Sequence, residues 1–305
     1  MRLLTHTNID FLSKRKRYYL LSLIVAIIGL AALFYNGIPL GIDFQGGTEM
    51  QVRFSNPVEV DELRDAMDKS GFSGMEIKSM GSEADYLLRT PLQGEGQTVA
   101  EKIQTGITEN LKGKSFEVLR TDKVGPKIGK ELRTNAIYAI VFSLLGILIY
   151  LALRFQLVYA IAAVVAVFHD VIITVSLVAL FNLIFPSLQL EFNQTMLAAF
   201  LTLIGFSTND TVVIFDRIRE NIKLFKNENI VSVMNKSVNA TLSRTFITSG
   251  TVLLTVLVLL FFGGEVLRGF AFTFTIGIIT GTYSTIFIAS AIAVDWQNKV
   301  VSKKK

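Results

Sequence analysis

Six apolar stretches divide the chain, and each is close to the roughly 20 residues that a helix needs to cross a bilayer. Formal charges are scarce inside these stretches and gather between them. The pattern therefore predicts six transmembrane helices with one long polar insert between the first and the second. We expect the helices over Tyr18–Gly37, Thr134–Leu153, Leu157–Phe181, Thr195–Phe215, Ala240–Phe261 and Phe270–Val294.

The insert, residues 38–133, has the pattern of a small water-soluble domain. Thr48–Phe54 alternates apolar and polar residues as a half-buried strand does, and Val58–Ser70 is amphipathic at helical spacing. The same reasoning predicts a second helix over Gln97–Leu111 and strands over Met75–Met80, Tyr86–Thr90 and Ser115–Val124. The order β-α-β-β-α-β predicts a ferredoxin-like α/β domain. The insert has no His or Cys cluster and no phosphate-binding loop, so nothing in it indicates catalysis.

Composition agrees with a polytopic membrane protein that carries one aqueous domain. The chain is 51% hydrophobic with a mean hydropathy of +0.49, yet 18% of its residues are charged. Its formal charge of +5 comes from basic residues beside the apolar stretches, which indicates orientation in a bilayer rather than binding to nucleic acid. The absence of cysteine excludes disulfides and thiolate metal sites, and we expect no metal and no cofactor.

The distribution of Lys and Arg predicts the topology, because these residues flank the cytoplasmic ends of membrane helices. The opposite short connections, Asn182–Gln194 and Phe262–Gly269, hold only one basic residue, Arg268. Both termini are therefore expected in the cytoplasm, with the insert exported. The basic residues on the cytoplasmic side are Lys14–Arg17, Arg154, Arg217, Arg219, Lys223, Lys226, Lys236, Lys299 and Lys303–Lys305.

These observations divide the chain into four parts. Residues 1–37 form a cytoplasmic start and the first helix, which we interpret as retained because Tyr18–Ile42 is too long for a signal peptide and has no small-residue cleavage site. Residues 38–133 are the exported domain, and residues 134–294 hold helices two to six. Residues 295–305 are a basic tail. Within the third part, the cytoplasmic segment 217–240 is expected to extend the fourth helix over Arg217–Asn221 and to form a short surface helix over Asn229–Asn239.

Two charged residues lie inside predicted spans. Asp210 follows an uncharged stretch that begins at Phe192, and a carboxylate at that depth costs roughly 2.5–3.5 kcal/mol on insertion scales. Arg244 lies near the start of the fifth span at a similar depth, so the two side chains are candidates to face each other. A desolvated carboxylate can exchange a proton near neutral pH, which favours a role in proton conduction. The alternatives are a structural polar contact for Asp210 and an Arg244 side chain that reaches the head groups.

His169 and Asp170 lie near the middle of the third span and are further candidates for proton conduction. A polar contact between helices is an equally good interpretation of this pair. Ser207 lies one helical turn before Asp210 and is a candidate hydrogen-bond donor to it. Further candidates for polar support or close helix packing are Asn209, Thr248, Gly277 and Gly281.

The exported domain begins with Gly41-Ile42-Asp43-Phe44-Gln45-Gly46-Gly47-Thr48 and leaves through Val124-Gly125-Pro126. Gly46 and Gly47 permit a tight turn or a close approach of the backbone. These motifs, His169-Asp170, the run Gly205–Asn221 and the run Ser243–Thr251 together resemble the SecF family, the smaller subunits of the bacterial SecDF complex of protein export. The resemblance covers essentially the whole chain, and Asp43, Gly46 and Gly47 belong to its family motif.

The resemblance implies a six-helix half of an RND-superfamily transporter that is not an enzyme and resides in the bacterial inner membrane. It implies that residues 38–133 are periplasmic and that the proton-motive force drives late steps of protein export. It also implies that Asp210 and Arg244 take part in proton conduction together with an aspartate of SecD. The partners it implies are SecD, the SecYEG channel and an unfolded preprotein, and it admits YajC.

Three other functions remain open at this point. A proton-driven exporter of small molecules would have the same helices, although it would favour a larger insert with an apolar pocket. An intramembrane hydrolase would use Asp170 and Asp210 as a pair of carboxylates that share a proton. A structural assembly factor would have no need for the acidity of Asp210.

Overall fold

The computed structural model describes residues 7–80, 82, 84–91, 98–185, 188 and 190–302. The chain forms two compact units, and each has its own hydrophobic core. The first unit comprises Met1–Pro39 together with Ile137–Lys305, and the second comprises Leu40–Ala136. This division separates the predicted membrane bundle from the predicted insert.

Within the described residues, six helical spans are long and apolar enough to cross a membrane, which confirms the predicted number. The sixth span is interrupted by a five-residue π-helix, η2, in which the helical repeat is wider than in an α-helix. The helices of these spans are α1 (Arg15–Asn36), α5 (Pro126–Arg154), α6 (Leu157–Ile184), α7 (Gln194–Leu224), α8 (Ile230–Phe262), α9 (Gly264–Ser284), η2 (Thr285–Ala289) and α10 (Ser290–Ser302).

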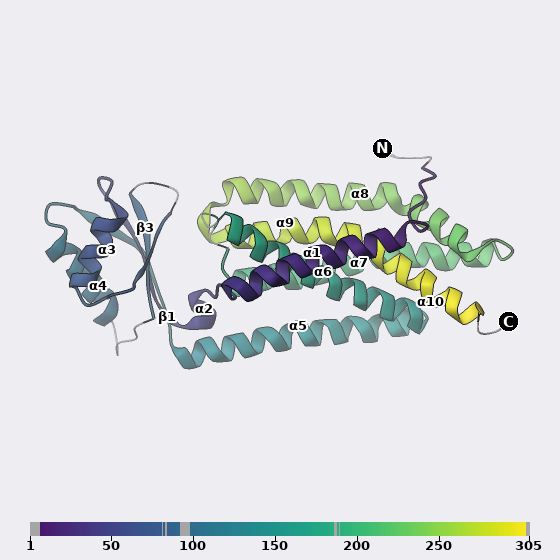
Figure 1. The fold of residues 1–305 in the computed structure, drawn as a ribbon, viewed down its shortest axis with the longest axis horizontal. Coiled ribbons are helices and arrows are strands. Elements are labelled where there is room, and N and C mark those ends of the chain that lie inside the picture. Colours follow the sequence, from purple (N-terminus) through teal and green to yellow (C-terminus); the bar gives the residue numbers. More distant parts are fainter. Residues whose placement is uncertain are drawn as a thin grey trace. The chain divides into compact units, whose positions relative to one another are not determined.

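In the first unit, α6, α7 and α9 form the centre of the bundle (Figure 1). Helix α9 packs against α6, α7 and α8, and α1 packs against α6. Gly29 of α1 allows this last contact, because a Cβ at this position would lie 2.2 Å from the Cβ of Ser176. Helices α8 and α5 lie at opposite edges in the view of Figure 1, and most apolar side chains of α5 are exposed.

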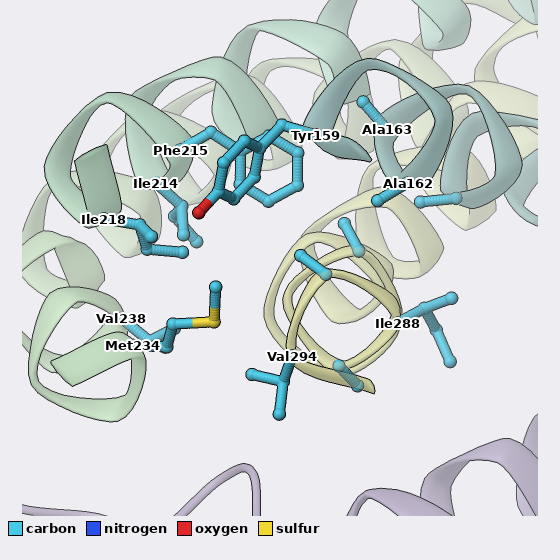
Figure 2. Close-up of a cluster of buried hydrophobic side chains, with 14 of the residues drawn as sticks. Tyr159, Ala162, Ala163, Ile214, Phe215, Ile218, Met234, Val238, Ile288 and Val294 are labelled. Carbon is cyan, nitrogen blue, oxygen red and sulfur yellow. The ribbon is translucent and has the colours of Figure 1, made fainter. Parts of the chain in front are cut away.

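We use "basic end" for the end of the bundle that holds Arg15, Phe155 and the α7–α8 connection, residues 225–229. Here Arg15 of α1 forms an ion pair with Asp295 of α10, with 2.7 Å between Nε and Oδ1. A large apolar cluster fills the same end. Figure 2 shows the rings of Tyr159 and Phe215 side by side in this cluster, with centroids 5.1 Å apart, and Met234 extending from α8.

The connection between α7 and α8 differs from the expectation of a separate surface helix. Helix α7 does continue past its apolar part and ends at Leu224. Residues 229–239, however, contain the first part of α8, which runs without interruption into the fifth span. The Asn229 side chain caps α8 by accepting a hydrogen bond from the amide of Val231 at 2.9 Å. The expected surface helix and the fifth span therefore share this single helix start.

The second unit has a four-stranded sheet in the order β2-β3-β1-β4, with each neighbouring pair antiparallel. This is the predicted ferredoxin-like arrangement. The main core contains buried side chains of the sheet and of the two helices, among them Met50, Leu63, Leu88 and Ile103. The elements are β1 (Gly47–Phe54), α3 (Val60–Lys69), β2 (Glu76–Ser79), β3 (Asp85–Thr90), α4 (Thr98–Asn110) and β4 (Phe116–Val124).

The family-motif glycines lie where this unit begins. Asp43 is in the short helix α2 (Ile42–Gln45), and the amide of Gly46 donates to the carbonyl of Ile42 at 2.8 Å. Gly46 and Gly47 have φ values of 82° and 142°, which are rarely open to other residues. A Cβ at Gly47 would also lie 2.7 Å from the carbonyl oxygen of Thr90, so both the tight turn and the close approach are present.

A bidentate ion pair across β1 and β3 makes the stability of this unit depend on pH. Arg53 donates through two nitrogens to Asp85 at 2.7 and 2.8 Å, and these hydrogen bonds lower the pKa of Asp85. The carboxylate therefore stabilises the fold above its unfolded pKa of about 3.9, and this contribution is lost as pH falls through the lower folded pKa. We expect Asp85→Asn to lower the thermal midpoint at pH 7 and to remove part of the loss on acidification.

The measurement is hydrogen exchange of the β1 and β3 amides at increasing temperature. The temperature at which these amides lose their protection reports the thermal midpoint of the second unit. Asp61→Asn is the matched control, because Asp61 is 91% exposed in its pair with Arg64 and contributes little. Equal pH dependence in Asp85→Asn and the unmodified protein would contradict the prediction.

Candidate functional site

Asp170 of α6 is completely buried in the centre of the bundle and joins three helices. Its Oδ2 accepts hydrogen bonds from Ser207 of α7 at 2.5 Å and from Ser284 of α9 at 2.8 Å. Its Oδ1 lies 3.1 Å from Nδ1 of His169. Since a buried carboxylate is costly without hydrogen bonds, these three helices must stay close enough to supply them.

Two glycines of α9 allow this close packing. A Cβ at Gly277 would lie 2.9 Å from Cδ1 of Leu203, and a Cβ at Gly281 would lie 3.1 Å from the Cβ of Ser207. Both neighbours are on α7. The small-residue pair predicted from the sequence therefore lies at the α7–α9 contact, one turn before Ser284 reaches Asp170.

Buried hydroxyl pairs continue the polar region on both sides of Asp170. Thr174 and Thr280 lie on the side away from the basic end, with 3.2 Å between their hydroxyl oxygens. Thr211 and Thr285 lie on the side toward the basic end, with 3.1 Å between their hydroxyl oxygens. Together with the Asp170 contacts, these pairs form a polar track between α6, α7 and α9 that follows the direction of the helices.

His169 connects this track to α1. Its ring stacks on Tyr283 with centroids 6.4 Å apart, and the Tyr283 hydroxyl donates to the carbonyl of Tyr18 at 3.0 Å. The same hydroxyl lies 3.3 Å from Oγ of Ser22. Nε2 of His169 is buried and has no hydrogen-bond partner among the described residues. Sequence reasoning identified His169 but missed Tyr283, because an aromatic residue in an apolar span carries no signal of its own.

Asp210 lies at a second polar site, between α7 and α8. It is buried, and its Oδ2 accepts a hydrogen bond from Ser249 at 3.0 Å. The expected donor, Ser207, donates to Asp170 instead, because it faces α6 and α9 rather than α8. Ser249 was not recognised as a partner of Asp210. The signal for it was the i, i+4 spacing of Thr241, Thr245 and Ser249, which are all buried on one face of α8.

Arg244 is exposed on the surface of the bundle. It interacts electrostatically with Asp210 but forms no ion pair with any residue in the described part of the chain. Asn209 is also exposed, and Thr248 is half-buried. Arg244 and Asn209 belong to a stripe of exposed polar or small residues on the neighbouring helices α7 and α8, whose other members are Thr202, Gly205, Thr251 and Thr255.

No group of three or more His, Asp or Glu side chains that could hold a metal ion occurs in the described ranges. The arrangement is instead suited to holding and exchanging protons. It contains two buried carboxylates, each bonded to hydroxyl groups, and a cation close to one of them.

Comparison with known proteins identifies the family. The family described as protein export membrane protein SecD/SecF, C-terminal, matches residues 103–299, and the SecD/SecF GG motif matches residues 31–58. The second match includes Asp43, Gly46 and Gly47. The chain belongs to the SecD/SecF family.

Relatives of the SecD/SecF family match over nearly the entire chain. The protein translocase subunit SecF of Rhodothermus marinus is 41% identical over 100% of this chain and 98% of its own length. The SecF of Calditerrivibrio nitroreducens is 44% identical over 94% of this chain and 93% of its own. These matches confirm the resemblance to SecF, and with the six apolar spans they make the chain a multi-pass membrane protein.

The solved structure of SecDF from Thermus thermophilus, a translocon-associated membrane protein, has the same fold. It matches with a TM-score of 0.83 and 37% identity over 98% of this chain. A structure of SecDF in a super-membrane-facing form matches with a TM-score of 0.72 and 36% identity. In both cases the chain spans 40% of the length of the SecDF chain.

Gly281→Val tests the close packing of α7 and α9. The added side chain meets Ser207, so we expect α7 and α9 to separate and the Ser207–Asp170 hydrogen bond to break. Overpacking of this kind costs about 1–3 kcal/mol, which would lower the unfolding midpoint of the purified protein in detergent by several degrees.

Gly146→Val in α5 is the control, because a Cβ at Gly146 has open space around it. The same change of residue should leave its midpoint near that of the unmodified protein. Equal midpoints for the Gly281 and Gly146 variants would refute the packing role of Gly281.

Proposed function

We propose that this chain is a subunit of a bacterial Sec protein-export complex in which proton movement through the helix bundle drives late steps of export. The family and the full-length SecF relatives support the role in export. The buried Asp210, held by Ser249 beside the exposed Arg244, is the observation that supports proton coupling. The basic end is cytoplasmic in this proposal, and the second unit is periplasmic, in accord with the distribution of Lys and Arg.

A titratable carboxylate at Asp210 is energetically sufficient for such coupling. Moving one charge across a potential of 100 mV releases about 2.3 kcal/mol, which changes an equilibrium between two arrangements several tens-fold. Protonation of Asp210 removes its attraction to Arg244 and turns its contact with Ser249 into one between neutral groups. The contact between α7 and α8 therefore differs in strength between the two protonation states, as coupling requires.

Asp170 and His169 form the second site of proton exchange in this proposal. The hydroxyl pairs on both sides of Asp170 extend the polar track in the directions a proton would follow. The two carboxylates have separate hydrogen-bond partners and are not bonded to each other. A hydrolase with a shared proton between Asp170 and Asp210 is therefore not supported, since that chemistry needs adjacent carboxyl groups.

SecD is the proposed partner at the exposed stripe on α7 and α8. Arginine and asparagine are costly in contact with lipid, so Arg244 and Asn209 favour a protein partner that supplies polar groups, including a carboxylate for Arg244. The chain spans 40% of the solved SecDF, which leaves most of SecDF to provide that partner. SecYEG, YajC and an unfolded preprotein are further proposed partners, and they rest on the family alone.

Asp210→Asn tests the proton coupling. We expect preprotein export to fall at least about tenfold in a strain that lacks the native protein, because the amide preserves the hydrogen bond with Ser249 but cannot change its charge. Export of a secreted reporter is the measurement, with protein level and complex formation checked in parallel.

Asp216→Asn is the matched control on the same helix. Asp216 is only partly buried and pairs with Arg154 at the basic end, so its loss should leave export unchanged. Full export by the Asp210→Asn protein would eliminate proton coupling through this residue.

Cysteine cross-linking tests the proposed partner. The chain has no natural cysteine, so a single Thr251→Cys reports one position without background. With cysteines scanned along the SecD helices, we expect a covalent SecD product from Thr251→Cys. Leu145→Cys on the exposed surface of α5 is the control, and we expect no such product from it. SecD products from Leu145 and none from Thr251 would move the interface to α5.

A further inference from the structure

Two asparagines of α8 bind the backbone of the segment before α1. The amide of Ile9 donates to Oδ1 of Asn239 at 2.9 Å, and Nδ2 of Asn239 donates back to the carbonyl of Ile9 at 2.8 Å. Asn235 donates through Nδ2 to the same carbonyl at 2.8 Å and accepts from the amide of Phe11 at 2.9 Å. Both side-chain amides are thus engaged through both of their polar atoms.

These hydrogen bonds are made to the backbone of the segment and not to its side chains. The groups bonded are the amide and carbonyl of Ile9 and the amide of Phe11, two residues further along the segment. Asn235 and Asn239 are four residues apart, which places them one above the other on α8 at a spacing of about 5–6 Å. Both side chains can therefore reach the carbonyl of Ile9. The two asparagines therefore form a site for a peptide backbone.

Side chains of the bound segment supply the rest of the contact. Leu12 is completely buried and Phe11 is 8% exposed, and both belong to the apolar cluster at the basic end. The ring of Phe11 packs edge-on against Phe287, with centroids 5.6 Å apart. Met234 and Val238, which Figure 2 shows extending from α8, belong to the same cluster. The segment therefore contacts α8 through its backbone and η2 through Phe11.

The π-helix η2 links the contact with Phe11 to the polar track. It begins directly after Ser284, which donates to Asp170, and it contains Thr285, which pairs with Thr211. The hydroxyl of Ser290 donates to the carbonyl of Thr285 at 3.0 Å, a bond over five residues that fits the wider repeat. Short π-helical segments inside α-helices often lie at functional sites.

We infer that Asn235 and Asn239 form a peptide-binding site occupied by residues 9–12 of the same chain, and that the bound segment straps α8 to η2. Asn239 lies ten residues before Ser249 on one continuous helix, and η2 directly follows Ser284. The strap thus connects the helix that supports Asp210 to the helix that supports Asp170. Asn235 and Asn239 are positioning residues for both carboxylates, and this consequence for export rests on the proposed function.

Single-cysteine labelling tests the strap directly in the full-length protein. Leu12→Cys is placed in the cysteine-free chain, and its reaction with a membrane-impermeant maleimide is followed in inverted vesicles. Because Leu12 is buried, we expect slow labelling that becomes about tenfold faster when Asn235→Ala and Asn239→Ala are added. Ser13→Cys is exposed and should react quickly in both backgrounds.

Two further variants keep the test decisive. Phe11→Cys repeats the measurement at a second buried position, in case the change at Leu12 itself loosens the strap. Ser232→Ala alters an exposed residue at the same end of α8 and should leave both rates unchanged. The inference is overturned if Leu12→Cys and Phe11→Cys react as fast as Ser13→Cys before the asparagines are changed, or if changing the asparagines has no effect.

Labelling and export give separate answers. The strap is measured without any export, so an Asp210→Asn protein that exported normally would refute proton coupling and leave the strap intact. We expect the double asparagine variant to lower the export rate several-fold at a normal protein level. Faster labelling with unchanged export would overturn the positioning role of the two asparagines.

Discussion

The bundle depends on one constraint, the need of a fully buried carboxylate for hydrogen-bond donors. Helix α6 alone does not supply the hydrogen-bond donors that the Asp170 carboxylate needs. The donors Ser207 and Ser284 come from α7 and α9. The approach of these helices requires small residues, which Gly277 and Gly281 provide. In an apolar environment helix association gains little from hydrophobic burial, so such polar contacts and close packing carry much of the specificity. The centre of the molecule is organised around this requirement.

Helix α7 separates two polar regions with different surroundings. Ser207 faces the closed interior of the unit, where it contacts Asp170 together with His169 of α6 and Ser284 of α9. Asp210, one turn further along, faces α8 and is close to a stripe of polar residues on the surface. The donors to Asp170 come from this chain, whereas the exposed Arg244 forms no direct ion pair with a described residue and acts on Asp210 only through its charge. A partner subunit would therefore influence Asp210 directly and Asp170 through α7.

Sequence reasoning recovered the features that depend on local composition. The six spans, the strand order of the second unit, and the charged residues in apolar stretches follow from the cost of burying polar groups and from the helix and strand repeats. Sequence reasoning did not predict which face of each membrane helix is buried, because such a helix is apolar on all sides and its pattern does not identify the interior side. The Ser207–Asp170 bond was missed for that reason, and for Arg244 two alternatives, a contact with Asp210 and a side chain that reaches the head groups, were left open. The Asn239–Ile9 bonds join residues 230 positions apart, beyond the reach of any local pattern.

The chemistry of the donors at Asp170 separates its behaviour from that of an ion pair. A hydroxyl is both a donor and an acceptor, and rotation about a single C–O bond exchanges the two roles. When Asp170 takes up a proton, the hydroxyl of Ser207 or Ser284 can turn so that its oxygen accepts a hydrogen bond from the carboxyl group, while every heavy atom keeps its place. The carboxyl group can thus change charge without driving α6, α7 and α9 apart. In the proposed function, Asp170 therefore holds its three helices in place in both protonation states, and displacement of helices falls to the contact between α7 and α8.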